Sequence, residues 1–393
     1  MNAASRLGNG PSVATITGGI PATNLWFYRQ IRFLVGDPAA LISIPGQGST
    51  LILRDIEMDR ARRHARADRI ASPRDFAPSG GLSGDRETAT AQAAAECLNR
   101  AGVHQVTTDR TLPMLYTHIL GKAGIEVRCD PERGVLERRA KDEQEVEFLR
   151  QAQRITEQAV EHACRMVASA RAEKDGALTF EGAPLTSERI REEIDIWLLR
   201  RGFMNPAMIV AGGPKGADCH DRGSGPLRTE EPVIIDIFPR SRDTLYNGDC
   251  TRTVVHGPEK NISEPIRRMH TAVVEAKRAA IGATRAGVTG EAVHEATSRV
   301  ITQHGFAMGL PKPSDPPTHT AMVHGTGHGV GLEVHEPPLL DKGGPALIAG
   351  DCLTIEPGLY CRALGGIRVE DMVIVRDGGC DNLNSIHEGL TWR

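Results

Sequence analysis

The sequence predicts an α/β protein built from two parts, a smaller N-terminal domain and a larger C-terminal domain. The chain has 393 residues, more than one ordinary domain holds, and 40% of them are hydrophobic, enough for a core in each part. Short apolar runs alternate with helical stretches in the first third, and the pattern changes near Lys141. Beyond that point, an order of two helices followed by a set of strands occurs twice.

The N-terminal part, residues 1–140, is expected to be an α/β domain. Its apolar runs bounded by turn residues predict strands. These runs are Ala40–Ile44, Thr50–Leu53, His104–Thr107 and Gly124–Cys129. Helices are predicted at Asp55–Ala67 and Glu87–Ala101. The segment Ile70–Gly84 is rich in proline and glycine and is expected to be a loop.

The C-terminal part, residues 141–393, is predicted to begin with a long helix from Asp142 to Ala170. Apolar residues recur there at a spacing of three and four, so one face of the helix is buried. They are Phe148, Ala152, Ile155, Ala159, Ala163 and Met166. Asp142 and Glu145 form a capping pair, which places the domain boundary just before the helix.

The rest of the C-terminal part alternates helices with strands. Helices are predicted at Ser187–Arg201, from Ser263 onward and at Thr289–His304. Strands are predicted at Met208–Ala211, Pro232–Ile237, Thr244–Val255, Ala321–Val334, Cys352–Ile355 and Gly366–Val375. The repeated order predicts two similar halves packed face to face, although the sequences of the halves are not alike.

Charge and composition exclude several classes of protein. The formal net charge is −3 and no lysine- or arginine-rich block occurs, so neither nucleic acid nor a membrane is an expected partner. No stretch is apolar enough for a membrane-spanning helix, and the start of the chain lacks the pattern of a signal peptide. The eight cysteines form no Cys-x-x-Cys pair and are expected to be reduced thiols. The protein is therefore expected in the cytoplasm.

Acidic residues occur within or at the ends of strongly apolar strands. They are Asp236, Asp249, Glu356 and Glu370. A buried carboxylate is costly unless it is paired or bound to a metal. A β-hairpin with strand-end aspartates explains the first two taken alone, and a salt bridge to Arg368 explains the last. The whole set is better explained together, as part of a metal site.

The segment His324–Pro338 adds three histidines and four glycines to these carboxylates. Glycine lets the backbone approach a site closely, and crowded histidines indicate ligands or acid/base groups more than packing. Carboxylates with one imidazole suit manganese, cobalt, zinc or iron. Carboxylates that bridge two such ions favour a hydroxide at neutral pH.

The order of these segments resembles the pita-bread metallopeptidase superfamily, which includes methionine aminopeptidases, prolidases, aminopeptidase P and creatinase. The resemblance covers roughly Lys141 to the C-terminus. All of the superfamily's metal ligands find a match, at Asp236, Asp249, His328, Glu356 and Glu370. The N-terminal domain and His324 resemble the Xaa-Pro dipeptidase and Xaa-Pro aminopeptidase branch more than methionine aminopeptidases.

This resemblance implies a pita-bread fold with pseudo-twofold halves, after a smaller α/β domain. It also implies a homodimer and two divalent ions, manganese first, with cobalt, zinc or iron as alternatives. Asp249 and Glu370 would bridge the ions, Asp236 would complete one, and His328 with Glu356 would complete the other. The implied activity is hydrolysis of the Xaa-Pro bond of a dipeptide or short peptide by a metal-bridging hydroxide.

The resemblance also implies roles for residues around the metals. Glu356 would manage the proton of the attacking water. His335 would hydrogen-bond the carbonyl as its oxyanion develops. His220 would contact the scissile amide or the leaving group, with a polar loop histidine of no catalytic role as the alternative. His324 would assist proton transfer or hold the proline side. Arg368 would bind a substrate carboxylate, with an ion pair to Glu370 as the alternative.

Two other functions remain open at this point. One is a non-proline aminopeptidase, or another hydrolase of a small C–N bond, because fold and metal do not fix the substrate. The other is a non-enzymatic binding protein, which would usually have lost the metal ligands that this chain retains. Asp236 and Asp249 are 249 − 236 = 13 positions apart, and Ile-Phe-Pro-Arg replaces a glycine-containing turn after Asp236. Neither the substrate preference nor the choice between dipeptidase and aminopeptidase is therefore fixed.

Overall fold

The computed structural model describes residues 13–205 and 207–392. The chain divides into two compact units, Met1–Arg138 and Arg139–Arg393. The boundary expected from the sequence lies two residues later, between residues 140 and 141. None of the helices in the described residues combines the length and the apolar character that a bilayer crossing needs.

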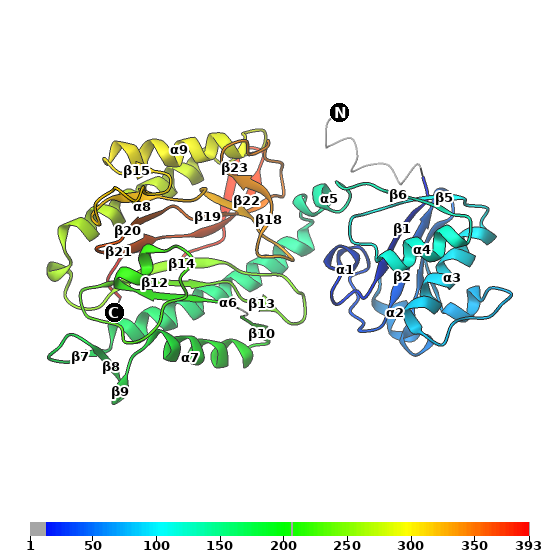
Figure 1. Cartoon of the computed structure of the whole chain (residues 1–393), viewed down its shortest axis with the longest axis horizontal. Helices are drawn as coiled ribbons and strands as arrows, with labels where there is room; N and C mark the ends of the chain where they lie inside the picture. Colours follow the sequence, from blue (N-terminus) through cyan, green and yellow to red (C-terminus); the bar gives the residue numbers. More distant parts are fainter. Residues whose placement is uncertain (1–12, 206, 393) are drawn as a thin grey trace. The chain divides into compact units, whose positions relative to one another are not determined.

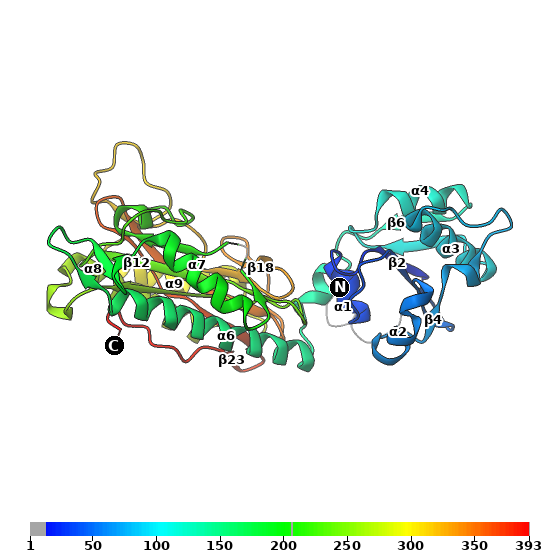
Figure 2. The ribbon, with the colours of Figure 1, turned by 90° about the horizontal axis from the view of Figure 1, so that it is seen from below.

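The first unit is a six-stranded sheet in the order β4-β3-β2-β1-β5-β6. Helices cover both of its faces, α3 and α4 on one side and α1 and α2 on the other (Figure 2). The strands are β1 (Thr15–Gly19), β2 (Ala39–Ile44), β3 (Gly48–Ile52), β4 (Arg69–Ala71), β5 (Gln105–Thr108) and β6 (Glu126–Cys129). The helices are α1 (Leu25–Ile31), α2 (Met58–His64), α3 (Arg86–Arg100), α4 (Met114–Lys122) and α5 (Val135–Arg139).

Two strands of this sheet do not follow from the sequence pattern. β1 has one large apolar residue, Ile16, among threonines and glycines, yet all five of its residues are buried. Gly18 packs closely against Tyr116. A Cβ on Gly18 would come within 2.7 Å of that ring. β4 lies in the segment Ile70–Gly84 that was expected to be a loop, so that prediction is wrong at its start. A three-residue strand is too short to show alternation, and pairing with β3 forms it.

The second unit places its sheets between two pairs of helices (Figure 1). One pair is α6 (Glu143–Ala168) and α7 (Ser187–Leu199), and the other is α8 (Glu264–Ala283) and α9 (Gly290–Gln303). The principal sheets run in the orders β11-β12-β14, β15-β16-β20-β21 and β18-β17-β19-β22-β23. This arrangement agrees with the two halves expected from the repeated order of elements.

The strands of the second unit are mostly short. Those of the principal sheets are β11 (Ile209–Gly212), β12 (Pro232–Ile237), β14 (Cys250–Val255), β15 (Ala307–Met308), β16 (Thr320–Met322), β17 (Gly327–Gly329), β18 (Glu336–Leu340), β19 (Cys352–Ile355), β20 (Gly358–Cys361), β21 (Gly365–Arg368), β22 (Asp371–Arg376) and β23 (Gly379–Asn382). The remaining ones are β7 (Arg171–Ala172), β8 (Leu178–Phe180), β9 (Ala183–Pro184), β10 (Phe203–Met204) and β13 (Arg240–Ser241).

Helix α6 begins at the expected capping box, in which Asp142 and Glu145 accept each other's backbone N–H groups. Its buried face runs against β14 and carries Gln153. The amide of Gln153 accepts from the N–H of Asp249 at 2.8 Å and donates to its carbonyl at 2.7 Å. Glycine is required at position 248, where a Cβ would lie 2.1 Å from the hydroxyl of Thr156.

Two segments predicted as strands are each broken in two. One break lies just before His328 and the other at Glu370, two of the predicted metal ligands. The segment Ala321–Val334 forms β16 and β17, which belong to different sheets. The segment Gly366–Val375 forms β21 and β22, with Glu370 between them. At this break the N–H of Glu370 donates to the carbonyl of Thr251 at 3.0 Å, so the chain changes partner strand there.

Candidate metal centre

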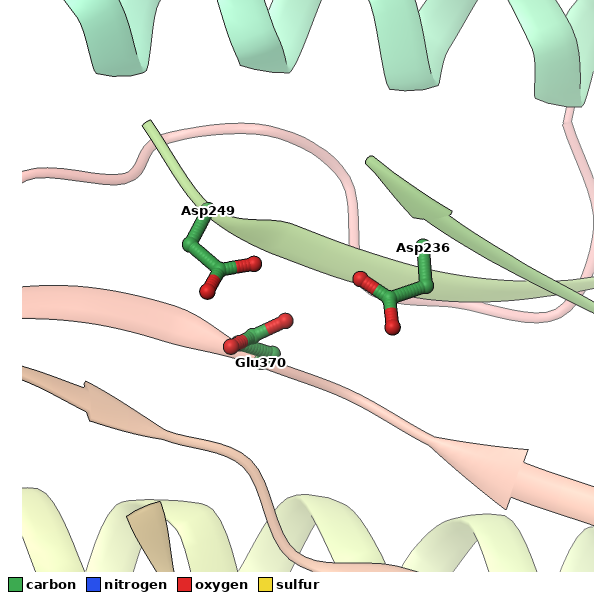
Figure 3. Close-up of side chains that lie close together, drawn as sticks. All are labelled: Asp236, Asp249 and Glu370. Atoms are coloured by element: carbon green, nitrogen blue, oxygen red, sulfur yellow. The ribbon is translucent and has the colours of Figure 1, made fainter. Parts of the chain in front are cut away.

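Three carboxylates meet between the two halves of the second unit (Figure 3). Asp236 lies on β12, Asp249 directly precedes β14, and Glu370 lies between β21 and β22. One carboxylate oxygen from each residue lies within 4.8 Å of an oxygen from each of the other two, and all three residues are buried. Their side chains point into a common space (Figure 3).

His328 and Glu356 extend this cluster. His328 lies on β17, and its Nε2 atom is 4.0 Å from Asp249 Oδ2 and 3.3 Å from Glu356 Oε1. Glu356 directly follows β19. The Thr354 hydroxyl accepts from the N–H of His328 at 3.0 Å and lies 3.4 Å from Glu356 Oε1. The structure thus brings together the five residues that the sequence marked as metal ligands.

The protein environment makes this cluster unfavourable for negative charge. Burial first, and then the neighbouring carboxylates, raise the pKa of Asp249 and of Glu370 well above their usual values. Burial also raises the pKa of Glu356. Burial lowers the pKa of His328, which favours the neutral imidazole that ligates metals. A bound cation would instead favour the ionised form of these carboxylates.

The residues of the cluster fit a pair of divalent cations. Asp236 Oδ1 is buried and has no hydrogen-bond donor within the described part of the chain, while its Oδ2 accepts from Arg368. A buried carboxylate oxygen without a donor is rare in proteins and needs a partner of another kind. Four carboxylates and one imidazole are a donor set for hard and borderline ions.

A second layer of hydrogen bonds orients the carboxylates. Thr251 donates its hydroxyl hydrogen to Glu370 Oε2 at 2.7 Å, and Gln153 holds both backbone groups of Asp249. Such partners fix the direction of ligand oxygens and are part of a metal site's design. The sequence analysis gave these residues no role. Gln153 is 96 positions from Asp249 along the chain, and Thr251, although only two positions from Asp249, carries no local mark of its contact with Glu370.

Arg368 is buried beside the cluster, and the structure corrects its expected ion-pair partner. Its guanidinium pairs with Asp236, where the sequence suggested Glu370 as the alternative. It also donates to Tyr360 Oη at 2.9 Å, to the carbonyl of Cys219 at 3.1 Å and to Thr251 Oγ1 at 3.3 Å. These contacts make it a support of the metal ligands, and they give no support to a role in binding a substrate carboxylate.

A cavity of about 270 Å³ opens from the carboxylates, and the remaining predicted histidines line it. The ring of His335 lies 4.4 Å from that of His328, measured between centroids. His220 is exposed and lines the cavity too. His324 also lines the cavity and contacts Tyr360, to which the sequence analysis gave no role. All three histidines therefore face the space next to the cluster.

The tautomer of His324 follows from its two partners. Its Nδ1 lies 2.8 Å from the carbonyl of Gly325, which can only accept, so Nδ1 carries a proton. Its Nε2 lies 2.8 Å from Tyr360 Oη, and burial lowers the pKa of the ring. In the neutral imidazole Nε2 is then the acceptor, and the hydroxyl of Tyr360 donates to it.

The loop that carries His335 is tied to the start of α6. Glu336 Oε1 accepts from the N–H groups of Leu332 and Glu333 at 3.0 and 3.1 Å. Its Oε2 is 3.0 Å from the ammonium group of Lys141, and both side chains of this ion pair are almost fully buried. The loop is therefore fixed by the charged hydrogen bonds of Glu336, which were not predicted from the sequence.

Comparison with known proteins agrees with this geometry. In sequence, the chain is 27% identical over 253 residues to the Xaa-Pro dipeptidase of Pyrococcus furiosus, a match that spans 64% of each chain. In structure, it resembles the X-Pro aminopeptidase of Thermotoga maritima with a TM-score of 0.77 and 21% identity, over 96% of this chain and 97% of that one. The Xaa-Pro dipeptidase of Bacillus anthracis gives a TM-score of 0.76 at 21% identity, over 96% and 94%.

These structural likenesses confirm the predicted fold, an α/β domain followed by a pita-bread domain with two halves. The sequence match spans less than two thirds of the P. furiosus enzyme, so the match alone does not carry that enzyme's activity over to this chain. Residues 147–377 match the model of metallopeptidase family M24. This match covers more than half of the chain and contains every residue of the carboxylate and histidine cluster, and the chain therefore belongs to metallopeptidase family M24.

Proposed function

We propose that this chain hydrolyses the peptide bond on the amino side of proline in short peptides, using two divalent metal ions. The observation that carries the proposal is the buried cluster of four carboxylates and His328, which opens into a cavity lined by further histidines. Similarity to proteins named Xaa-Pro dipeptidase and X-Pro aminopeptidase supports proline as the residue after the scissile bond.

Metal ions held by the cluster would polarise a substrate carbonyl and make water a nucleophile near neutral pH. The ligands would be Asp236, Asp249, His328, Glu356 and Glu370. Manganese suits their oxygen-rich set best, and cobalt, zinc or iron also accept it. A homodimer is proposed on the likeness to the Xaa-Pro branch, and a cytoplasmic compartment on the eight free cysteines.

The chain's own residues then manage protons and charge. Glu356 would take the proton of the attacking water and deliver it to the leaving nitrogen. His335 would donate a hydrogen bond to the carbonyl oxygen as negative charge develops on it. His220 would contact the scissile amide. Because both nitrogens of His324 already have partners, we assign it to holding the proline side rather than to carrying protons.

The test is peptide hydrolysis by metal-stripped protein reloaded with manganese. Gly-Pro and Ala-Pro are compared with Ala-Pro-Ala, and Ala-Ala-Ala serves as the peptide without proline. Cleavage restricted to the proline peptides supports the proposal. Cleavage of Ala-Ala-Ala at an equal rate would point to an aminopeptidase without proline preference. A protein that binds no metal would instead be a binding protein on this fold.

A further inference from the structure

The cavity beside the carboxylates has two ends of different character. The carboxylates and His328 form its deep end. Leu339 and Asp341 also line the cavity, but Leu339 is 58% exposed and the Asp341 side chain 50% exposed, so they mark its mouth. Leu339 lies near the end of β18, and Asp341 follows that strand directly.

Asp341 has a fixed position at this mouth. Its Oδ1 accepts from the N–H of Lys342 at 2.7 Å and lies 3.6 Å from Nε2 of His294. Its side chain packs on Gly325, where a Cβ would lie 3.1 Å from Asp341 Cβ and 3.3 Å from its Cγ. The carboxylate is thus held against Gly325, the residue that follows His324 in the chain, on the side of the cavity that we assign to the residue after the scissile bond.

Among the described residues that line the cavity, no lysine or arginine is left to balance this carboxylate. Among the described residues that line it, Arg368 is the one lysine or arginine, and its charge is paired with Asp236. His294 can offset Asp341 only when its ring is protonated. A second carboxylate entering this end would lose water without gaining a lysine or arginine as its partner, and it would be repelled by Asp341.

The length of a substrate decides whether such a carboxylate enters. Because we assign the His324 side of the cavity to the residue after the scissile bond, the amino end of a peptide would lie on the other side of the metal centre, and each residue extends the chain by about 3.5 Å. In a dipeptide, the C-terminal carboxylate therefore lies one residue beyond the scissile bond, near His324. In a longer peptide an uncharged amide takes that place.

We infer that Asp341, together with Leu339, makes the site discriminate against a free carboxylate on the proline and select tripeptides and longer chains. The inference rests on the proposed hydrolysis of Xaa-Pro bonds and deepens it. A cationic residue after the proline would be favoured further, because its charge approaches Asp341 at the mouth.

The experiment measures kcat/KM of the manganese-loaded protein for Ala-Pro, Ala-Pro-NH₂, Ala-Pro-Lys-NH₂ and Ala-Pro-Glu-NH₂. We expect Ala-Pro-NH₂ to exceed Ala-Pro, and the lysine peptide to exceed the glutamate peptide, each by about 10-fold, as one unfavourable charge contact predicts. Asp341→Asn should reduce both ratios severalfold. Leu339→Arg should supply the missing cation and raise the rate on Ala-Pro relative to its amide. Asp377→Asn, at an exposed turn away from the cavity, is the matched control and should leave both ratios as in the wild type.

Equal rates on Ala-Pro and Ala-Pro-NH₂, with neither ratio altered in Asp341→Asn, would overturn the inference while leaving the proposed hydrolysis intact. Inactivity on all four peptides with manganese bound would overturn both. Thermal melting of each variant checks its folding. If Asp341→Asn does not fold, the test is the ratio of kcat/KM for Ala-Pro to that for Ala-Pro-NH₂ in Leu339→Arg. A ratio equal to that of the wild type counts against the inference.

Discussion

Asp249 and Glu370 are carboxylates that the protein keeps away from water without giving them a cation. Their raised pKa values and the unpartnered oxygen of Asp236 show the same physical situation, in which negative charge is concentrated and not neutralised. Arg368 neutralises part of it, but it pairs with Asp236 alone. Divalent ions are the partners that such a group of oxygens is built to receive.

The first prediction concerns the ligand oxygens. Asp249→Asn removes a charged oxygen from the centre of the cluster, so the protein should lose bound metal as well as activity. Metal content after dialysis, measured by mass spectrometry, checks this. Asp243→Asn changes an exposed residue of the same hairpin and should keep the wild-type content. Full metal content in Asp249→Asn would show that Asp249 is not a ligand.

The second prediction separates a catalytic residue from a ligand. His335→Ala should lower kcat by about 100-fold, as the loss of one oxyanion donor does, while metal content stays unchanged. Steady-state kinetics and metal analysis on the same sample provide the two readings. The exposed His104 gives a control, since His104→Ala should not alter kcat. A His335→Ala protein with wild-type kcat would remove His335 from the mechanism.

At the scale of elements, the loop that carries His335 depends on the ion pair between Lys141 and Glu336. Lys141→Met would break this buried ion pair by removing the ammonium group, a change that costs about 3–5 kcal/mol. We expect a lower free energy of unfolding in urea and a lower kcat with metal retained. Lys260→Met, on an exposed turn, is the comparison. Unchanged stability and kcat in Lys141→Met would mean that the loop is held by other contacts.

The start of β22 carries a second buried charge network. Asp371 accepts from Arg252 at 2.7 Å and from Lys277 at 2.5 Å. Burial opposes its ionisation, but the two cations prevail and lower its pKa. A lowered pKa in the folded state gives stability that is present above about pH 4, the ordinary aspartate range, and is lost as the pH falls further.

Replacing Asp371 by asparagine should therefore reduce the free energy of unfolding at pH 7 and flatten its decline in acid. Urea titrations of wild type and Asp371→Asn between pH 2 and pH 7 measure both effects. Asp381→Asn is the control, because Asp381 forms its ion pairs at a more exposed position on β23. Parallel pH curves for wild type and Asp371→Asn would show that this network does not couple stability to pH.

Helices followed from the sequence better than strands did. Capping residues and apolar spacing are local signals, so α6, α7 and α9 begin within a residue of their expected starts. Strands depend on partners elsewhere in the chain. The breaks before Glu370 and before His328 arise because the backbone there leaves one sheet for another, and no local pattern records that change.

Across the whole molecule, the ligands could be predicted and much of their support could not. Carboxylates in apolar strands carry a cost that is visible in sequence, which is why the cluster was found before its geometry was known. Thr251, Gln153 and Lys141 are ordinary residues whose roles arise only from folding. Their contacts with the ligands and with the His335 loop join segments more than 90 residues apart, as with the 96 positions from Gln153 to Asp249.

Metal binding should couple to pH through the whole cluster. Raised carboxyl pKa values mean that the metal-free fold gains stability as pH falls through them, since protonation removes the repulsion. Binding of metal should then release protons from those carboxyl groups of the cluster that are still protonated. Calorimetric titration with manganese, in buffers of different ionisation enthalpy at pH 6 and pH 8, measures the release. No release at either pH would contradict the coupling of metal binding to protonation of the cluster.

The measurement that bears most directly on the metal centre is hydrolysis of Ala-Pro-Ala by wild type and by Asp249→Asn, each stripped of metal and then titrated with manganese. We predict that stripped wild type is inactive and that its activity rises to a plateau at two ions per chain. Asp249→Asn should stay inactive over the same range of concentrations. Full activity without metal, or equal recovery in Asp249→Asn, would contradict the proposal that these carboxylates form a catalytic metal centre.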